Sequence, residues 1–88
     1  MRQYQRQIIP EGRGVHPFVR WIWRRINIDQ WSQEDLAKRS GVSSSAMRKW
    51  RRGDRNPRIS ELEAVINAMG FHLVLKENFF DEENRREK

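Results

Sequence analysis

The sequence predicts a mainly α-helical domain that ends in a single β-strand. Apolar residues recur at helical spacing in four segments between residues 17 and 69, and glycines at positions 41 and 70 end two of these segments. The segment FHLVLKE, residues 71–77, instead alternates apolar and polar residues. A chain of 88 residues forms one small domain with a modest core, which oligomerisation often stabilises. We divide it into a flexible basic arm at 1–16, the helical domain with its strand at 17–76, and a charged tail at 77–88.

The first helix is expected from Pro17 to about Asn27, because proline suits the first turn of a helix. Trp21 would face outward beside two arginines, where it could stack on a partner or pack within the protein; we favour packing. The inward positions are Phe18, Val19, Ile22, Trp23 and Ile26.

The second helix has well-defined signals at both ends. Ser32 is a good N-cap, Asp35 at the third helical position completes a capping box, and Trp31 can pack on Leu36 as a hydrophobic staple. Gly41 follows a basic last turn, where a left-handed residue would satisfy free carbonyl groups and redirect the chain. A tight turn to the next helix is therefore expected.

The third helix is expected to be apolar on one face and cationic on the other. Ser43 can cap it, and Ala46, Met47 and Trp50 would pack inward. Residues 48–58 carry six cations and one acid, within a chain of net charge +6. Such a run is ordinarily a solvated face, but on the second helix of a helix-turn-helix pair it favours a phosphate backbone as partner.

The fourth helix is expected to begin at Ser60, through a capping box with Glu63, and to end at Gly70. Its core positions are Leu62, Val65, Ile66 and Met69.

The strand at residues 71–77 needs a neighbour, because a lone strand leaves its backbone groups unpaired. We favour a second copy of the same strand across a homodimer, with Phe71, Leu73, Val74 and Leu75 as the dimerisation residues. Two alternatives stay open: pairing with the weak strand candidate Tyr4 to Ile9, or a strand that covers the core of a monomer. Phe79 and Phe80 would either cover the core beneath this strand or dock on another protein.

Several classes of protein and site are not expected. The chain has no cysteine, which excludes disulfides, thiolate metal sites and cysteine nucleophiles. No apolar run approaches the roughly 18 residues of a membrane span, and the N-terminus lacks a signal-peptide apolar region, so we expect a cytoplasmic protein without a membrane partner. His16 and His72 have no metal-ligand spacing, and no nucleophile is placed beside a base. We therefore expect no catalytic residues, no metal and no cofactor.

From Ser32 to Gly70 the chain resembles the helix-turn-helix domains of the Cro and phage-repressor family, also called the XRE family. One departure is Arg51, where the family commonly has glutamate, so an ion pair that the resemblance implies lacks its acidic member here. The matching elements are Ser32-Gln33, Leu36-Ala37, Gly41-Val42-Ser43, Met47, Trp50, Gly53 and Pro57.

This resemblance implies binding of double-stranded DNA through the third helix. It places base contacts at Ser44, Ser45, Arg48 and Lys49. The candidates for phosphate contacts are Gln33, Ser43, Arg52, Arg55 and Arg58. Alternatives are open for three of them: Gln33 as an ordinary first-turn residue, Arg55 as a turn residue, and Arg58 as a reader of a narrow minor groove.

The sequence thus predicts a sequence-specific transcriptional regulator, a repressor that acts as a homodimer on a palindromic operator and is encoded by a phage or mobile element. One alternative is an antitoxin that autoregulates its operon and neutralises a toxin through a terminal extension. Another is a protein-interaction module of the same fold that has lost operator readout.

Overall fold

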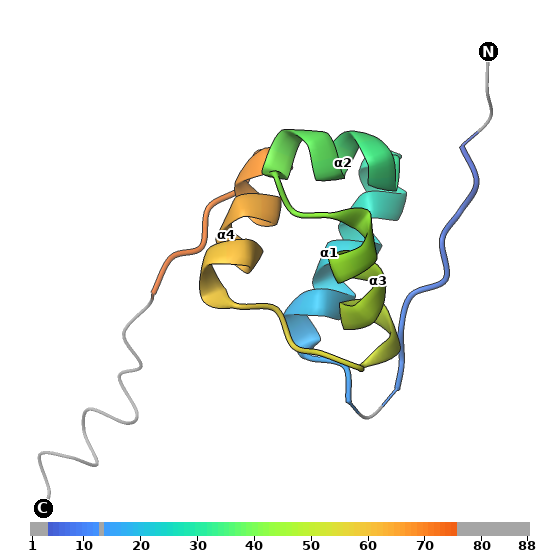
Figure 1. Cartoon of the computed structure of the whole chain (residues 1–88). Helices are drawn as coiled ribbons and strands as arrows, with labels where there is room; N and C mark the ends of the chain where they lie inside the picture. The colour runs from blue at the N-terminus through green and yellow to red at the C-terminus, as the bar shows by residue number, and fades with distance from the viewer. Residues whose placement is uncertain (1–3, 13, 76–88) are drawn as a thin grey trace, which may run out of the picture.

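The protein is described by a computed structural model that covers residues 4–12 and 14–75 of the 88-residue chain. The described part contains α1 (Pro17–Asp29), α2 (Gln33–Ser40), α3 (Ser44–Arg52) and α4 (Ile59–Ala68). Figure 1 shows α1 and α3 beside each other, α4 on the opposite side, and α2 across the top. None of these helices is long and apolar enough to cross a membrane.

One hydrophobic core joins the four helices. Trp23 of α1 and Trp50 of α3 are its largest members and are 0% and 1% exposed. Fully burying a side chain of this kind stabilises a fold by about 2 kcal/mol or more, so the two indoles anchor α1 and α3 in the core. The other buried residues are Val15, Val19, Ile22, Ile26, Leu36, Val42, Met47, Leu62, Val65, Ile66 and Met69.

The predicted inward face of α1 is confirmed except at Phe18, which is 47% exposed. Phe18 lies in the first turn of α1, at the edge of the core, and its ring packs edge-on against His16 with centroids 4.8 Å apart. The core does reach this end of the helix through Val15 and Val19, but Phe18 lies on the side of α1 that faces away from them.

Hydroxyl caps begin α2 and α3 as predicted. Ser32 Oγ accepts a hydrogen bond from the backbone N–H of Asp35 at 3.0 Å, and Ser43 Oγ accepts one from the N–H of Ala46 at 3.1 Å. Gly41 ends α2 in the left-handed region at φ 77°, and its N–H donates to Ala37. These bonds fix the tight turn that places α3 against α2.

The predicted start of α4 at Ser60 is wrong, because the N-cap is Arg58. Glu61 occupies the third helical position, and its carboxylate accepts the backbone N–H of Arg58 at 2.9 Å. In the predicted box Glu63 would accept the N–H of Ser60, so the observed box is the same arrangement two residues earlier. Ser60 is instead a residue within the first turn.

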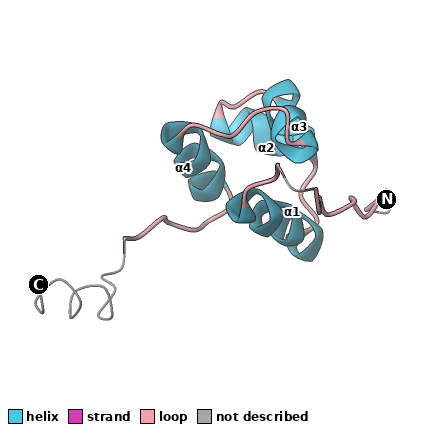
Figure 2. Cartoon of the chain, turned by 90° about the horizontal axis from the view of Figure 1, so that it is seen from below, coloured by secondary structure: helices cyan, strands magenta, loops and turns pink. Residues whose placement is uncertain are grey.

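The predicted strand is not present over residues 71–75, which run without regular structure, and Figure 2 shows only helices and loops in the described part of the chain. The N-terminal arm does not pair with this segment and lies against α1 instead. A strand requires a hydrogen-bonded neighbouring strand, and within the described residues no other segment pairs with residues 71–75. The last two residues of the predicted strand, together with Phe79 and Phe80, lie outside the described residues.

Candidate nucleic-acid interface

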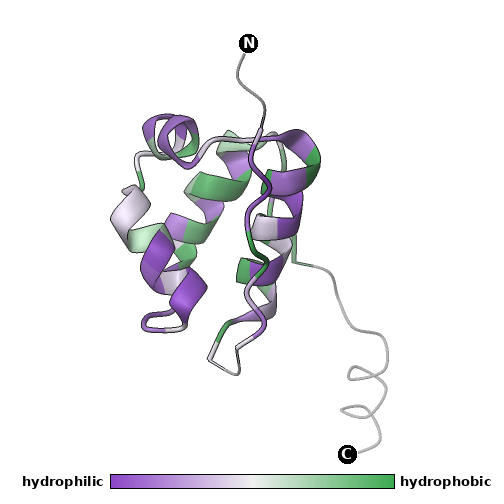
Figure 3. Cartoon of the chain, turned by 90° about the vertical axis from the view of Figure 1, so that its right-hand side faces the viewer, coloured by the Kyte–Doolittle hydropathy of each residue, from purple (hydrophilic) through white to green (hydrophobic). Residues whose placement is uncertain are grey.

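The third helix presents its polar face to solvent because Met47 and Trp50 are buried on the other side. Ser45, Arg48 and Lys49 are exposed, whereas Ser44 is half-buried. Figure 3 shows that the hydrophilic colouring continues from the C-terminal half of α3 into the loop that follows it. The four base-contact candidates therefore share one helix, and three of them are freely accessible.

Positive charge on this face is only partly compensated. Within the described residues, Arg48 and Lys49 have no salt-bridge partner. Arg52 Nε contacts Asp54 Oδ2 at 2.9 Å, but both side chains are more than half exposed, at 61% and 58%. An exposed pair of this kind contributes little and is screened by salt, so a phosphate group can replace Asp54.

Arg55 is held more firmly than Arg52. Its Nη2 lies 2.5 and 2.6 Å from the two carboxylate oxygens of Glu61. The Arg55 hydrogen bonds, followed by the backbone N–H of Arg58, hold the pKa of Glu61 below its ordinary value. Arg55 is therefore already paired with an acid, whereas the Arg58 side chain is exposed at the start of α4.

Ser43 lies at the N-terminal end of α3, and Gln33 lies at the N-terminal end of α2. The Ser43 oxygen accepts a bond from the helix, which leaves its hydroxyl hydrogen free to donate. Gln33 is half-buried, and its Nε2 donates to Oε1 of Gln7 in the N-terminal arm. Helix capping and phosphate contact are thus compatible at Ser43, and Gln33 has a partner that local sequence patterns do not indicate.

The docked position of the N-terminal arm was missed by sequence reasoning. Asn27 of α1 binds the backbone of Gln7 twice: its Oδ1 accepts the Gln7 N–H, and its Nδ2 donates to the Gln7 carbonyl, both at 2.8 Å. The Tyr4 hydroxyl donates to Asn27 Oδ1 at 2.8 Å, and its burial raises the pKa of the phenol. Tyr4 and Ile9 are half-buried against the core and Pro10 is buried. An asparagine that faces outward near a helix end is the one local signal that could have suggested this docking.

Arg51 takes part in this arm contact. The side chain is half-buried, its guanidinium carbon lies 5.9 Å from the centre of the Trp23 ring, and Nη1 lies 3.4 Å from Gln7 Oε1. Among the described residues it has no acidic partner. The charge at this position is therefore directed toward the arm and α1 rather than toward the outer face of α3.

The four dimerisation candidates fall into two pairs. Phe71 and Leu73 are half-buried against the core, and the Phe71 ring packs edge-on against Trp21 with centroids 5.2 Å apart. Trp21 thus packs within the protein, as favoured from the sequence. Val74 and Leu75 are exposed, at 80% and about 100%.

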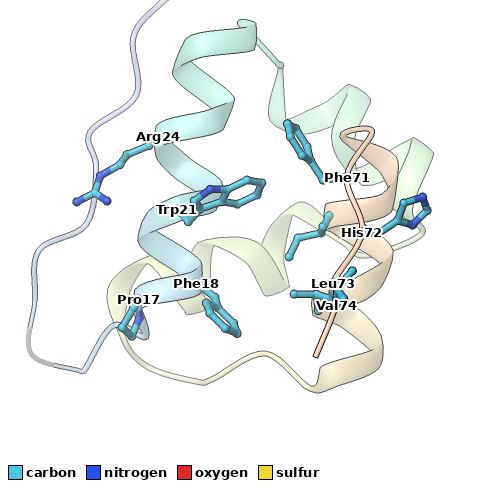
Figure 4. A pocket seen from close by; sticks show the side chains of 9 residues that line it. Pro17, Phe18, Trp21, Arg24, Phe71, His72, Leu73 and Val74 are labelled. Carbon is cyan, nitrogen blue, oxygen red and sulfur yellow. The ribbon is translucent and has the colours of Figure 1, made fainter. Parts of the chain in front are cut away.

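An apolar groove lies between the N-terminal half of α1 and residues 71–74. It has a volume of about 530 Å³, and Figure 4 shows Phe18 and Trp21 on one side of it and Leu73 and Val74 on the other. This groove is separate from the outer face of α3.

The profile of the helix-turn-helix family matches residues 30–75, just over half of the chain. The chain belongs to the helix-turn-helix family of the Cro/C1, or XRE, type. The matched range contains α2, the glycine turn, α3 and α4. This is a family of DNA-binding transcription regulators and is typically not enzymatic. Comparison with the curated proteins gives no match, and comparison with the solved structures gives none either.

Proposed function

We propose that the protein is a sequence-specific repressor that binds a palindromic operator as a homodimer. The observation that carries this proposal is the outer face of α3, where Ser45, Arg48 and Lys49 are exposed opposite the buried Met47 and Trp50. A helix of this family anchored on one side and cationic on the other can enter the major groove with its polar side chains toward the base edges. Repression then follows from occupation of the promoter.

The proposed contacts divide into base reading and phosphate binding. Arg48 can bind O6 and N7 of guanine with two hydrogen bonds, which discriminate against other bases by about 1–3 kcal/mol. Ser44 and Ser45 are small, so the backbone of α3 can approach the base edges closely. The phosphate contacts are Gln33, Ser43, Arg52, Arg55 and Arg58; among these, Arg55 must first leave Glu61.

The homodimer is supported by the exposed apolar side chains at the end of the described chain. Val74 lines the groove together with Phe18 and Trp21, and the exposed Leu75 is the next residue in the chain. Covering these surfaces with a second copy removes apolar area from water. On a palindromic operator, the two copies of α3 would read half-sites one helical turn apart, about 34 Å.

The test is selection of bound sequences from a random duplex pool at about 150 mM salt, followed by mass determination of the complex. Enrichment of an inverted repeat bound by two subunits supports the proposal. Binding without any enriched sequence contradicts operator readout.

A second function, binding of a protein partner as an antitoxin does, is favoured by the same apolar groove. If the groove takes a different protein, the chain alone should bind DNA as a monomer, and substitutions in the groove should not change the DNA affinity of that monomer. If it takes a second copy, the same substitutions should weaken operator binding and reduce the protein in the complex from two subunits to one.

A further inference from the structure

The side chain of Gln7 lies between the two helices of the helix-turn-helix motif. Its Oε1 accepts a hydrogen bond from Nε2 of Gln33, the first residue of α2. The same oxygen lies 3.4 Å from Nη1 of Arg51, in the last turn of α3. One oxygen atom of the N-terminal arm thus connects the start of one helix to the end of the other.

The position of that oxygen is fixed by the docked arm. Asn27 holds both backbone groups of Gln7, and Tyr4 bonds to the same asparagine amide. Pro10 is buried three residues further along. Because these contacts involve the backbone of Gln7 and neighbouring residues, its side chain can be changed without removing the bonds that dock the arm.

The chemistry of Arg51 fixes the orientation of both amides. A guanidinium has donors only, so the atom of Gln7 that faces Arg51 must be the oxygen and not the NH₂ group. The atom of Gln33 that faces this oxygen must then be the NH₂ group. One N–H of Gln33 is used in this contact, and the second N–H remains available on the half-buried side chain.

We propose that Gln7 is a positioning residue for DNA binding, which orients the Gln33 amide so that its second N–H meets a backbone phosphate. The N-terminal arm thereby belongs to the DNA interface through Gln33, without contact between Gln7 and the DNA. Arg51 has a role in this arrangement, since it is the donor that determines which way the Gln7 amide points. This inference rests on the proposed phosphate contact of Gln33.

The experiment is a double-mutant cycle on DNA affinity with Q7A, Q33A and the combined variant, measured on a random-sequence duplex and on the selected operator. A phosphate contact acts on all sequences, so both duplexes should respond alike. We expect Q33A to lower affinity about tenfold for each bound subunit, as the loss of one hydrogen bond to a charged group does, and so about a hundredfold for the dimer. Q7A should lower it about three- to fivefold for each subunit, and the combined variant should be no weaker than Q33A alone.

Two further variants separate positioning from structure. Q5A changes an exposed glutamine of the same arm that has no hydrogen bond to a helix among the described residues, and it should leave affinity unchanged. Q7L keeps the bulk of the side chain but has no acceptor, and it should behave as Q7A does while its thermal midpoint stays within a few degrees of the parent.

The outcomes distinguish this inference from the function on which it rests. If the parent protein does not bind DNA, the proposed function fails. If the parent binds DNA, three results each overturn the inference: no effect of Q33A, losses for Q7A and Q33A that multiply in the combined variant, or parent affinity in Q7L.

Discussion

Replacement of Glu61 by glutamine should weaken folding and strengthen DNA binding. Both oxygens of the Glu61 carboxylate accept hydrogen bonds from Arg55, and one of them also accepts the backbone N–H of Arg58 at the start of α4. A glutamine oxygen can still accept the Arg58 N–H, so the substitution removes mainly the charge interaction with Arg55. This separates the ion pair from the helix cap.

The expected loss of stability is small because the pair is partly exposed, at 41% for Arg55 and 23% for Glu61. Pairs of this kind contribute up to about 1 kcal/mol. In a domain of this size, that corresponds to a decrease of roughly 4–8 °C in the thermal midpoint. Glu61→Ala should lose more, since it also leaves the Arg58 N–H without its acceptor.

The loss should depend on pH in a defined direction. The pKa of Glu61 is lower in the folded protein than its ordinary value, so its contribution is complete above the ordinary glutamate range. It disappears as pH falls through the folded pKa. Urea denaturation should therefore show a difference between parent and Glu61→Gln at pH 7 that vanishes as the pH is lowered well below 4. An equal difference at pH 7 and pH 3 would refute the ion-pair explanation.

The gain in DNA binding follows from the release of Arg55. A dimer that neutralises about eight phosphates has a slope of log K against log salt near −7, at roughly −0.9 for each phosphate. Because Arg55 binds a phosphate in the proposed complex only after it leaves Glu61, removal of the acid should raise affinity by up to about fivefold for each subunit, the equivalent of about 1 kcal/mol, and leave that slope near −7. Fluorescence anisotropy between 50 and 200 mM salt, roughly the range in which such slopes are resolved, measures this. An unchanged slope with weaker binding would show that the pair supports the interface rather than competing with it.

Three other substitutions test separate parts of the interface. Arg48→Ala should reduce operator binding by about 1–3 kcal/mol for each half-site and relax the preference at one base of each, as competition with single-base operator variants would show. Equal losses on operator and random duplex would contradict base reading. Leu75→Asp should dissociate the homodimer in analytical ultracentrifugation while the helical circular dichroism signal is kept, because Leu75 is fully exposed in the single chain; a dimer that persists would place the contact elsewhere. Tyr4→Phe should loosen the arm by the loss of a partly buried hydroxyl donor. In the parent, the raised pKa of Tyr4 means that this stabilisation is complete below about pH 10 and is lost as pH rises further. Equal amide hydrogen exchange of residues 4–10 in both proteins at pH 7 would contradict a role of the hydroxyl in docking the arm.

Local chemistry was sufficient to predict the helix ends that depend on neighbouring residues. Ser32, Gly41 and Ser43 each form their capping bond within four residues along the chain. For α4 the local sequence allows two N-caps, Ser60 or Arg58. The N-cap is Arg58, which has no hydroxyl, because the Glu61 carboxylate accepts its backbone N–H. Local rules therefore give the element but not always its first residue.

The remaining differences come from contacts between residues distant in the sequence. The segment 71–75 has a strand-like pattern, but pairing depends on a neighbour that the pattern does not supply. The bonds between Gln7 and Asn27 join residues 20 positions apart, and those from Gln7 to Gln33 and Arg51 span 26 and 44. The sequence therefore predicted which side chains form the cationic face of α3, but not the partners of Gln33 and Arg55.

The measurement that tests the central claim most directly is an NMR titration of the ¹⁵N-labelled protein with its selected duplex. The account predicts that the largest amide shift changes fall on residues 43–52 of the turn and α3, and on Gln33, with small changes in residues 71–75 once the dimer has formed. Large changes confined to α1 and the groove, with α3 unaffected, would contradict the assignment of α3 as the DNA-reading helix.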